Sequence, residues 1–203
     1  MNLLHKLKPG LIIIASIMMT ACVMPKTSIT DISEVKKDEV IVVGKLQLLP
    51  HIRKDEVQLT NFITLGKSEF EPYQSIRLIV SDVYYDLEGQ AAHDFSDAIF
   101  TIDGEYFYFT WDRNKPMHML GTSFITRSTQ TNIDTMTLSL NKGLKVSHSK
   151  KSKAMYVGTI AFKRDEFFNI KDINISQKGY KKARSAFRKK FKTKMNLEKA
   201  KLS

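Results

Sequence analysis

The chain has 203 residues, a formal net charge of +11 at pH 7 and a single Cys. One Cys excludes an internal disulfide, and the length is enough for one domain with its own hydrophobic core. The excess of Lys and Arg indicates an anionic partner, such as a nucleic acid or a membrane surface.

The first 21 residues have the features of a signal peptide. Lys6 and Lys8 give a cationic start, residues 11–19 form an almost unbroken apolar run, and small residues precede Cys22. The apolar run has nine residues, whereas a transmembrane helix needs about 20. We therefore expect residues 1–21 to be a targeting segment that is removed, and not a membrane span.

The sequence Met19-Thr20-Ala21-Cys22 resembles the lipobox of bacterial lipoproteins, although Met19 stands where Leu is commonest. In that class a signal peptidase cuts before the Cys, which is then diacylated on its sulfur and usually acylated on its amine. The resemblance implies a mature chain that starts at Cys22 and stays on a membrane, because two acyl chains anchor stably. Val23 stands where an Asp would retain a lipoprotein in the inner membrane. The resemblance therefore implies the periplasmic face of the outer membrane.

Residues 22–38 are expected to be a flexible tether, since they combine a Pro, several Ser and Thr and mixed charges with little apolar periodicity. The charge of the remaining chain is unevenly distributed. Residues 178–203 hold eleven Lys and Arg against Glu198 alone, whereas residues 22–177 hold nineteen basic and twenty acidic side chains. The basic character belongs to the C-terminal segment, as is typical of an interaction tail.

Residues 39–177 are expected to form the folded domain. Runs of β-branched and alternating apolar residues predict strands over 40–50, 75–86, 118–128 and within 135–149, and two strands joined by a charged loop over 154–176. Residues 86–97 are expected to be a connecting loop or a short helix. Six to nine short strands with no helix before residue 177 predict a mainly β fold, an antiparallel sandwich or barrel. We take an antiparallel β-sandwich-like domain with a basic C-terminal α-helix as the working expectation.

Two turns are predicted from their residues. Asp103-Gly104 lies between two apolar runs and tolerates positive φ at both central positions, which predicts a hairpin with a type I′ turn. Asn141-Lys142-Gly143 predicts a second turn, into a strand that contains Leu144 and Val146.

The strand after Asp103-Gly104 is rich in aromatic residues on both faces. Tyr106 and Tyr108 share one face, and Phe107, Phe109 and Trp111 share the other. One face must belong to the core, and the other is either an aromatic binding surface or is covered by a loop or the C-terminal helix. We favour coverage of both faces, because large exposed aromatic patches are rare on soluble domains.

The C-terminal segment predicts a helix from about Tyr180 to Ala200, since Lys, Arg and Ala abound there and β-branched residues are scarce. Apolar residues at spacings of three and four define a stripe that is expected to dock on the domain: Tyr180, Phe187, Phe191 and Met195. The cations expected to contact an anionic surface are Lys181, Lys182, Arg184, Arg188, Lys189, Lys190, Lys192 and Lys194.

These cations fit several partners. Nucleic acid, which the mixture of cations and aromatic residues suggests, is excluded by the compartment that the signal segment implies. An anionic lipid or lipopolysaccharide fits the charge. The alternative is that the cations only solvate the outer face of a docked helix, and the two can hold together on different helix faces.

The densest set of possible metal ligands or acid–base groups is His93, Asp94 and Asp97. His93 and Asp97 could share a helical face, but a metal or catalytic site usually needs three or more converging groups. A polar loop with a capping Asp is favoured. His51, His118 and His148 are scattered, and the chain has no glycine-rich phosphate loop and no Gly-x-Ser-x-Gly motif.

We therefore expect a lipid-anchored envelope protein that acts by binding, as a non-catalytic accessory or assembly subunit of an envelope protein partner. No cofactor and no metal are expected. The alternative is a periplasmic enzyme whose site is assembled by the fold, around His93 and Asp97.

Overall fold

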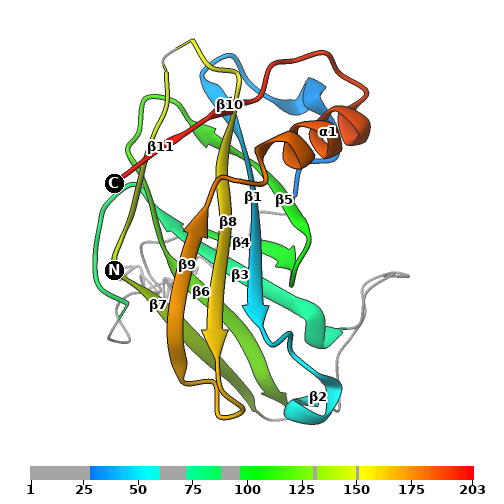
Figure 1. Ribbon diagram of the computed structural model, residues 1–203, viewed down its shortest axis with the longest axis vertical. Coiled ribbons are helices and arrows are strands. Elements are labelled where there is room, and N and C mark those ends of the chain that lie inside the picture. Colours follow the sequence, from blue (N-terminus) through cyan, green and yellow to red (C-terminus); the bar gives the residue numbers. More distant parts are fainter. Residues whose placement is uncertain (1–27, 60–71, 88–96, 130–131, 150) are drawn as a thin grey trace, which may run out of the picture.

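The computed structural model describes residues 28–59, 72–87, 97–129, 132–149 and 151–203. Two β-sheets pack face to face, and the one α-helix of the described chain, α1 (Tyr180–Phe191), lies on the outer face of one of them (Figure 1). The mainly β, sandwich-like fold predicted from the sequence is confirmed. Three 3-10 helices lie in the connections: η1 (Ile32–Glu34), η2 (Lys54–Glu56) and η3 (Pro72–Gln74).

The first sheet has the strand order β10-β8-β1-β5, with β9 on the same edge of β8 as β10. Its strands are β1 (Glu39–Leu49), β5 (Tyr106–Asp112), β8 (Ala154–Arg164), β9 (Ile170–Ser176) and β10 (Glu198–Lys199). β1 is antiparallel to β5 but parallel to β8. The sheet is therefore mixed, whereas the sequence had led us to expect a purely antiparallel one.

The second sheet has the order β11-β7-β6-β3-β4, with β2 also paired to β6. Its strands are β2 (Gln58–Leu59), β3 (Ser75–Ser81), β4 (Asp97–Ile102), β6 (Met117–Ser128), β7 (Ile133–Ser147) and β11 (Lys201–Leu202). The described chain thus has nine strands before residue 177, within the six to nine expected, and two more, β10 and β11, in the C-terminal segment where only a helix was expected. The two-residue strands β2, β10 and β11 are too short to leave a period-2 pattern in the sequence.

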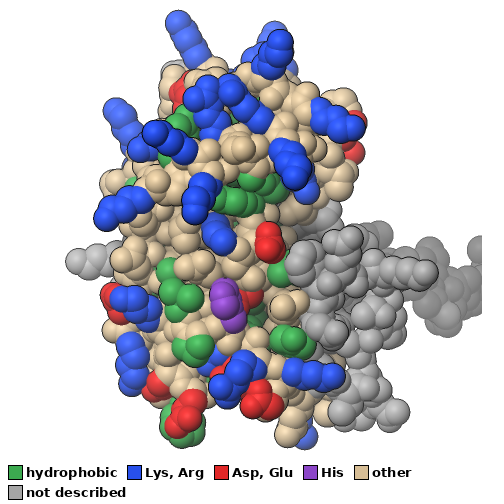
Figure 2. All heavy atoms as spheres, turned by 45° about the vertical axis from the view of Figure 1, so that its right-hand side comes forward, with side chains coloured by type: hydrophobic (Ala, Val, Ile, Leu, Met, Phe, Trp, Pro, Cys, Tyr) green, Lys and Arg blue, Asp and Glu red, His purple; other side chains and the backbone are tan. Residues whose placement is uncertain are grey.

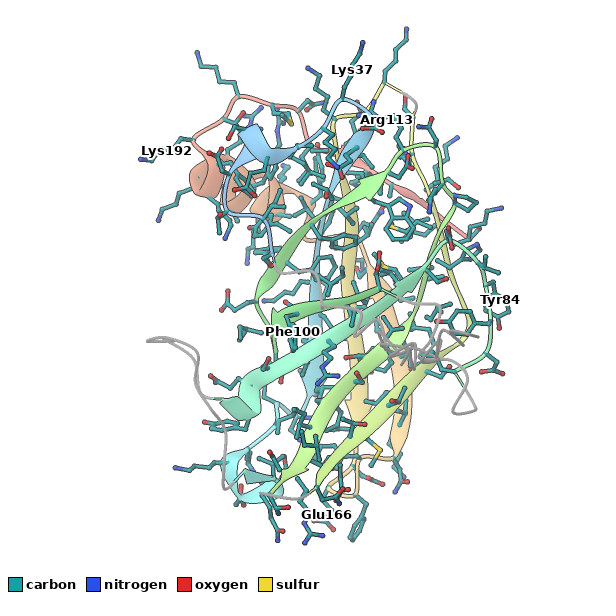
Figure 3. All side chains as sticks on the ribbon, turned by 180° about the vertical axis from the view of Figure 1, so that it is seen from behind. Lys37, Tyr84, Phe100, Arg113, Glu166 and Lys192 are labelled. Atoms are coloured by element: carbon teal, nitrogen blue, oxygen red, sulfur yellow. The ribbon has the colours of Figure 1, made fainter. Side chains whose placement is uncertain are left out.

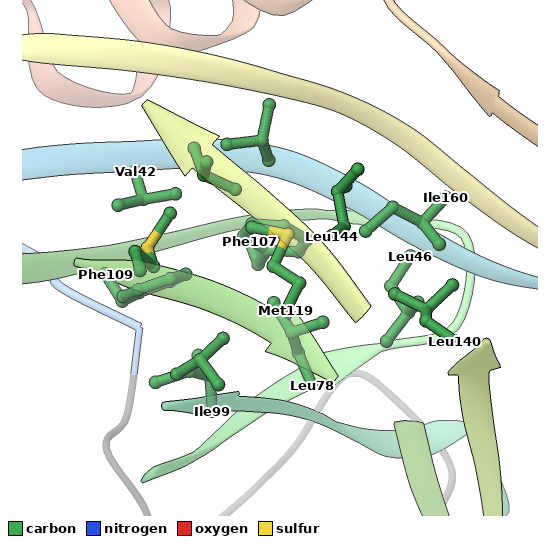
Figure 4. Packing of buried hydrophobic residues seen from close by; sticks show 14 of the residues in the cluster. Val42, Leu46, Leu78, Ile99, Phe107, Phe109, Met119, Leu140, Leu144 and Ile160 are labelled. Carbon is green, nitrogen blue, oxygen red and sulfur yellow. The ribbon is translucent and has the colours of Figure 1, made fainter. Parts of the chain in front are cut away.

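The core lies between the two sheets because alternate residues of each strand point inward. Val42, Leu46, Phe107 and Phe109 from the first sheet pack near side chains of the second, including Leu78, Ile99, Met119 and Leu140 (Figure 4). Phe107 and Phe109 have ring centroids 5.8 Å apart. Full burial of one such side chain stabilises the fold by about 1.5 to 3 kcal/mol.

The Asp103-Gly104 turn is formed, but the hairpin prediction is wrong. β4 pairs with β3 and β5 pairs with β1, so the chain crosses from one sheet to the other at this turn. Glu105 N–H donates to Ile102 O at 3.0 Å. φ is positive at Gly104 (84°) but not at Asp103, whereas a type I′ turn needs it at both.

The predicted turn at Asn141-Lys142-Gly143 is also wrong, because β7 keeps its direction through these residues. Leu144 pairs with Met119 and Ser139 pairs with Gly121, so the residues of β7 between them outnumber the one opposite and form a bulge. Gly143 has φ 62°, which a bulge can demand as readily as a turn.

Helix α1 ends at Phe191 and not near Ala200, because Lys192 adopts the left-handed conformation with φ 48° and its N–H bonds to Arg188 O. The chain then returns along the sandwich. Leu197 is buried, β10 pairs with β8, and β11 pairs with β7. The last residues therefore join both sheets, which a helical apolar spacing cannot predict.

Candidate functional site

The α1 stripe lies on the outer face of the first sheet, over β1, β5 and β8. Ala183 and Phe187 are fully buried there, and Tyr180, Phe191 and Met195 are partly buried against the same residues. We call this set the helix cluster; its buried members are Ile41, Val43, Tyr108, Ala154, Tyr156, Ala183, Phe187 and Leu197. The helix forms part of a second, smaller core.

Aromatic contacts fix the position of α1. The rings of Tyr108 and Phe191 meet edge to face with centroids 5.3 Å apart, and Tyr156 and Tyr180 lie 6.1 Å apart. The Tyr180 hydroxyl donates to Leu197 O and so ties the helix to the returning chain. Burial, with smaller effects of Tyr106 and Glu105, raises the pKa of Tyr108 to about 12. The aromatic strand β5 is thus covered on both faces, one by the second sheet and one by α1.

The cations of the C-terminal segment have no acidic partners in the part of the chain that the structure describes. None of the eleven Lys and Arg of residues 178–203 lies within 4.0 Å of a described carboxylate. α1 itself contains no acidic residue. The exposed members are Lys178, Lys181, Lys182, Lys189, Lys190, Lys192, Lys194, Lys199 and Lys201. No described carboxylate therefore neutralises their positive charge.

Four of these cations either lie over an aromatic ring of the protein or are half-buried; one of them, Lys199, has its Nζ 5.4 Å from the centroid of the Tyr180 ring. Lys190 Nζ lies 5.0 Å from the centroid of the Tyr108 ring, within range of a cation–π contact. Arg184 and Arg188 are half-buried, and the Nε of each is shielded from solvent without a hydrogen-bond partner among the described residues.

The N-terminal segment lies beside α1. Ile29 N–H donates to Tyr108 O at 2.8 Å, and Ile29, Ile32 and Val35 pack against the helix cluster. The part of the expected tether that the structure describes is thus attached to the domain from Ile29 on. Cys22 lies outside the described residues, six positions before Ser28.

Basic side chains gather at the α1 end of the molecule. Figure 3 places Lys37, Arg113 and Lys192 at this end and Glu166 at the opposite one. Figure 2 shows that Lys and Arg predominate over the end of the surface that carries α1, with a few acidic side chains among them, whereas basic and acidic side chains are more evenly mixed over the other end.

The opposite end is organised by Arg164, whose role left no signal in the sequence. Its fully buried guanidinium lies 2.6 Å from Glu56 Oε2 and also donates to Pro50 O and His51 O, each at 3.0 Å. Burial opposes ionisation of Glu56, but hydrogen bonds and the charge of Arg164 outweigh it and lower the pKa of Glu56. Arg164 and Glu56 are 108 residues apart, so no local motif could have revealed the pair.

His51 and Asp103 form the pair most similar to an acid–base dyad. Asp103 Oδ2 lies 2.9 Å from His51 Nδ1, and its Oδ1 accepts from Leu48 N–H at 2.8 Å. The Asp103 side chain is 3% exposed and that of His51 is 59% exposed. The carboxylate thus holds the end of β1 against the Asp103-Gly104 turn, which is a structural task.

The remaining candidates give no constellation. Asp97 begins β4, while His93 and Asp94 lie outside the described residues. No group of three or more His, Cys, Asp or Glu within the described ranges could hold a metal ion. Burial, reinforced by Lys145, lowers the pKa of His118, and burial with Arg113 lowers that of His148 despite the opposing charge of Glu198.

An open groove of about 410 Å³ lies between β7 and β9. Its lining is mostly apolar and includes Leu140, Ile170 and Ile173. Its charged members are already engaged, because Lys171 pairs with Asp165 and Asp172 with Lys163.

Comparison of the chain with protein-family models, curated proteins and solved structures finds no match. None of the described helices has the length and apolarity needed to cross a membrane.

Proposed function

We propose that this protein is a lipid-anchored envelope protein of the bacterial outer membrane. It acts by binding, as a non-catalytic accessory or assembly subunit on the periplasmic face, with its α1 end toward the membrane. The observation that carries the proposal is the meeting of two features at that end. The cations of residues 178–203 lack carboxylate partners among the described residues, and the segment that leads back to Cys22 packs beside them on the helix cluster.

The chain length supports this orientation. A lipid on Cys22 would be six residues away from Ser28, where the described chain starts. An extended chain spans at most about 3.5 Å per residue, or roughly 21 Å over six residues. An acylated Cys22 would therefore keep α1 near the lipid surface. The tether is shorter than residues 22–38 alone suggest, because Ile29 already contacts β5.

Electrostatics adds a second attachment. Each Lys or Arg close to an anionic surface contributes about 1 kcal/mol, and the effect decays over a Debye length of about 10 Å at 0.1 M salt. An anchor that holds α1 close to the surface makes these contributions effective. The same cations would favour anionic lipid or lipopolysaccharide over a neutral surface.

The anchor is tested by expressing the full chain in a diderm bacterium with labelled palmitate and separating membrane from soluble fractions. Wild-type protein should carry the label and sediment with the outer membrane, and Cys22→Ser should lose both properties. A wild-type protein without label would overturn the anchor.

The binding role is tested by crosslinking in intact cells followed by gentle solubilisation. A stoichiometric envelope protein should be recovered with the wild-type chain. Recovery of the monomer alone would count against an accessory or assembly role, whatever the result for the anchor.

A further inference from the structure

The outer edge of β9 has no neighbouring strand in the described chain. β9 is antiparallel to β8 along one edge and pairs with no other described strand. Figure 1 shows β9 on the side of β8 that faces away from β1 and β5. Successive N–H and C=O groups of a strand alternate between its two sides, so about half of those on β9 point away from β8. Such a row of unpaired groups is a template for a further strand.

The C-terminal segment already lies across this side of the sandwich, but it does not reach β9. β10 pairs with Met155 and Tyr156 of β8, and β11 pairs with Val146 and Ser147 of β7. An extended chain can therefore bridge the two sheets on this side. Neither β10 nor β11 pairs with β9 or with residues 133–144 of β7, so this part of the open side has no strand of the described chain over it.

The groove between β7 and β9 runs along this unpaired edge. Ile173 and Ile175 pair with Phe162 and Ile160 of β8, which are fully buried in the core, so both point toward the inside of the sandwich. Ile175 is nevertheless 37% exposed. A strand added to β9 would direct alternate side chains into the same groove. Those side chains would cover Ile175.

The charges of the groove favour an uncharged occupant. Lys171 lies 3.0 Å from Asp165, and Asp172 lies 2.8 Å from Lys163, so these four side chains satisfy one another. Charged residues usually guard an exposed edge, but here each is engaged within its own chain and the net charge of the four is zero. An uncharged segment rich in Val, Ile and Thr matches this lining, because β-branched residues favour extended backbone and their side chains suit an isoleucine-lined groove.

A second copy of the chain fits this edge poorly. Antiparallel pairing of two β9 strands would place the two α1 ends at opposite ends of the pair, whereas the proposed orientation directs both toward one membrane. Parallel pairing about an axis along the strands would exchange the inner and outer faces. The apolar row that contains Ile173 would then continue as the exposed row of Asp172 and Asn174. The occupant is therefore a segment of a different protein.

We propose that the outer edge of β9 is the docking site for an extended, uncharged segment of the envelope protein partner. The segment adds as a strand to β9 and places its apolar side chains in the groove beside β7. Its backbone hydrogen bonds supply affinity, and the alternate side chains in the groove supply specificity. The inference rests on the proposed function as a binding subunit, and it names the surface and the kind of segment that this function uses.

Two variants with the same charge change separate the groove from the rest of the strand. Ile175→Lys places a cation in the groove. The matched control, Asn174→Lys, adds the same charge one position earlier, where the side chain is exposed and pairs with Ala161 on the outer face. The mature chain, residues 22–203, carries Cys22→Ser for the measurements in solution, and thermal unfolding checks that both variants fold.

The probe is the strand Thr-Val-Thr-Val-Thr-Val-Thr, joined to Ser203 by a flexible Gly/Ser linker that raises its effective concentration to about 1 mM. The control probe is Thr-Pro-Thr-Pro-Thr-Pro-Thr on the same linker, which cannot pair as a strand. Hydrogen exchange of the β9 amides that point away from β8 should be about ten-fold slower with the Val strand. This factor is expected when the effective concentration is ten times the dissociation constant.

The slower exchange should be lost in Ile175→Lys and retained in Asn174→Lys. Equal exchange with the two probes in the otherwise unchanged chain would overturn the docking site, and this comparison decides even if Ile175→Lys unfolds. An equal loss in both variants would also overturn it, because added charge anywhere on β9 would then explain the effect.

Crosslinking in intact cells tests the partner. The envelope protein recovered with the wild-type chain should also be recovered with Asn174→Lys but not with Ile175→Lys. Equal recovery with all three chains would reject the β9 edge and leave the accessory role standing. Recovery of a second copy of this chain alone would overturn a different protein as the occupant, and recovery of the monomer alone would reject the accessory role itself.

Discussion

At the end of the sandwich beside the β8–β9 connection, Arg53, Lys163 and Arg164 each lie within 4.0 Å of a carboxylate. At the α1 end, no Lys or Arg of residues 178–203 has such a partner among the described residues. The comparison indicates that the cations at the two ends have different roles. Where they are paired they hold loops together, and where they are unpaired they remain available to an external anion.

The two ends also differ in the interactions that hold their backbone segments in place. Asp165 accepts hydrogen bonds from the N–H groups of Phe167 and Asn169 and pairs with Lys171 at 3.0 Å, so that the β8–β9 connection is closed by its own charges. Apart from the Tyr180 hydroxyl and the contact of Lys190 with the Tyr108 ring, aromatic and aliphatic contacts hold α1 on the domain. The exposed Lys181, Lys182 and Lys189 can therefore be changed without removing those contacts.

Replacement of Arg164 should produce the largest effect. Arg164→Met keeps much of the side-chain volume but leaves Glu56, whose side chain is 9% exposed, without its buried partner and with only the exposed Arg53 guanidinium at 3.6 Å. Breaking a buried ion pair on one side costs about 3 to 5 kcal/mol. Urea unfolding at pH 7 should show a loss of that size.

The matched control is Lys163→Met, one residue earlier, whose pair with Asp172 is exposed on both sides. Exposed pairs contribute about 1 kcal/mol or less. Similar losses for the two variants would contradict a structural role specific to Arg164.

Truncation of Phe187 should destabilise the other end through packing. Phe187→Ala removes a fully buried ring from the helix cluster, and such changes cost about 3 to 5 kcal/mol. Hydrogen exchange should show that the α1 amides lose protection. Ser185→Ala, on the exposed face, should leave both stability and exchange nearly unchanged; equal protection in the Phe187 variant would mean that the stripe does not hold the helix.

Local patterns predicted much of this fold. Spacings of three and four placed Tyr180, Phe187 and Phe191 on one stripe, and alternation gave most of the longer strands. The partner of each strand could not be predicted in the same way. A turn such as Asp103-Gly104 looks alike whether its strands pair with each other or, as here, with different sheets.

The candidate site was predictable to the extent that it is local in sequence. The charge of residues 178–203 and the resemblance at Cys22 are evident from the amino-acid sequence alone. The burial of Arg184 Nε and Arg188 Nε depends on how α1 rests on β1 and β8, and the Arg164–Glu56 pair depends on strands that meet only after folding. Such features belong to the tertiary structure, and propensity contains no information about them.

The two ends should also differ in their response to acid. A hydrogen bond from Lys171, opposed by burial and assisted by Asn169 and Phe167, lowers the pKa of Asp165 below its ordinary value of 3.8. A carboxyl whose folded-state pKa is lowered stabilises the fold above its unfolded pKa, and that contribution is lost as pH falls below it. The urea midpoint of wild type should therefore fall more steeply between pH 5 and pH 3 than that of Asp165→Asn. Equal slopes for wild type and Asp165→Asn would contradict this role of the Asp165 carboxylate.

The smallest effect on stability should come from the exposed lysines of α1. Lys181→Gln/Lys182→Gln/Lys189→Gln removes three cations that lack acidic partners in the described chain, so the free energy of unfolding should change by less than about 0.5 kcal/mol.

The salt dependence of stability should distinguish the cations of the α1 end from those of the opposite end. Raising the salt to about 0.5 M screens repulsion among unpaired cations and attraction within exposed pairs alike. At high salt the wild type should therefore gain stability relative to the triple variant, because the repulsion that involves the three lysines is present only in wild type and is screened by salt. For Lys163→Gln/Lys171→Gln, which removes two paired cations, the shift should have the opposite sign, and equal signs would mean that the two ends do not use their cations differently.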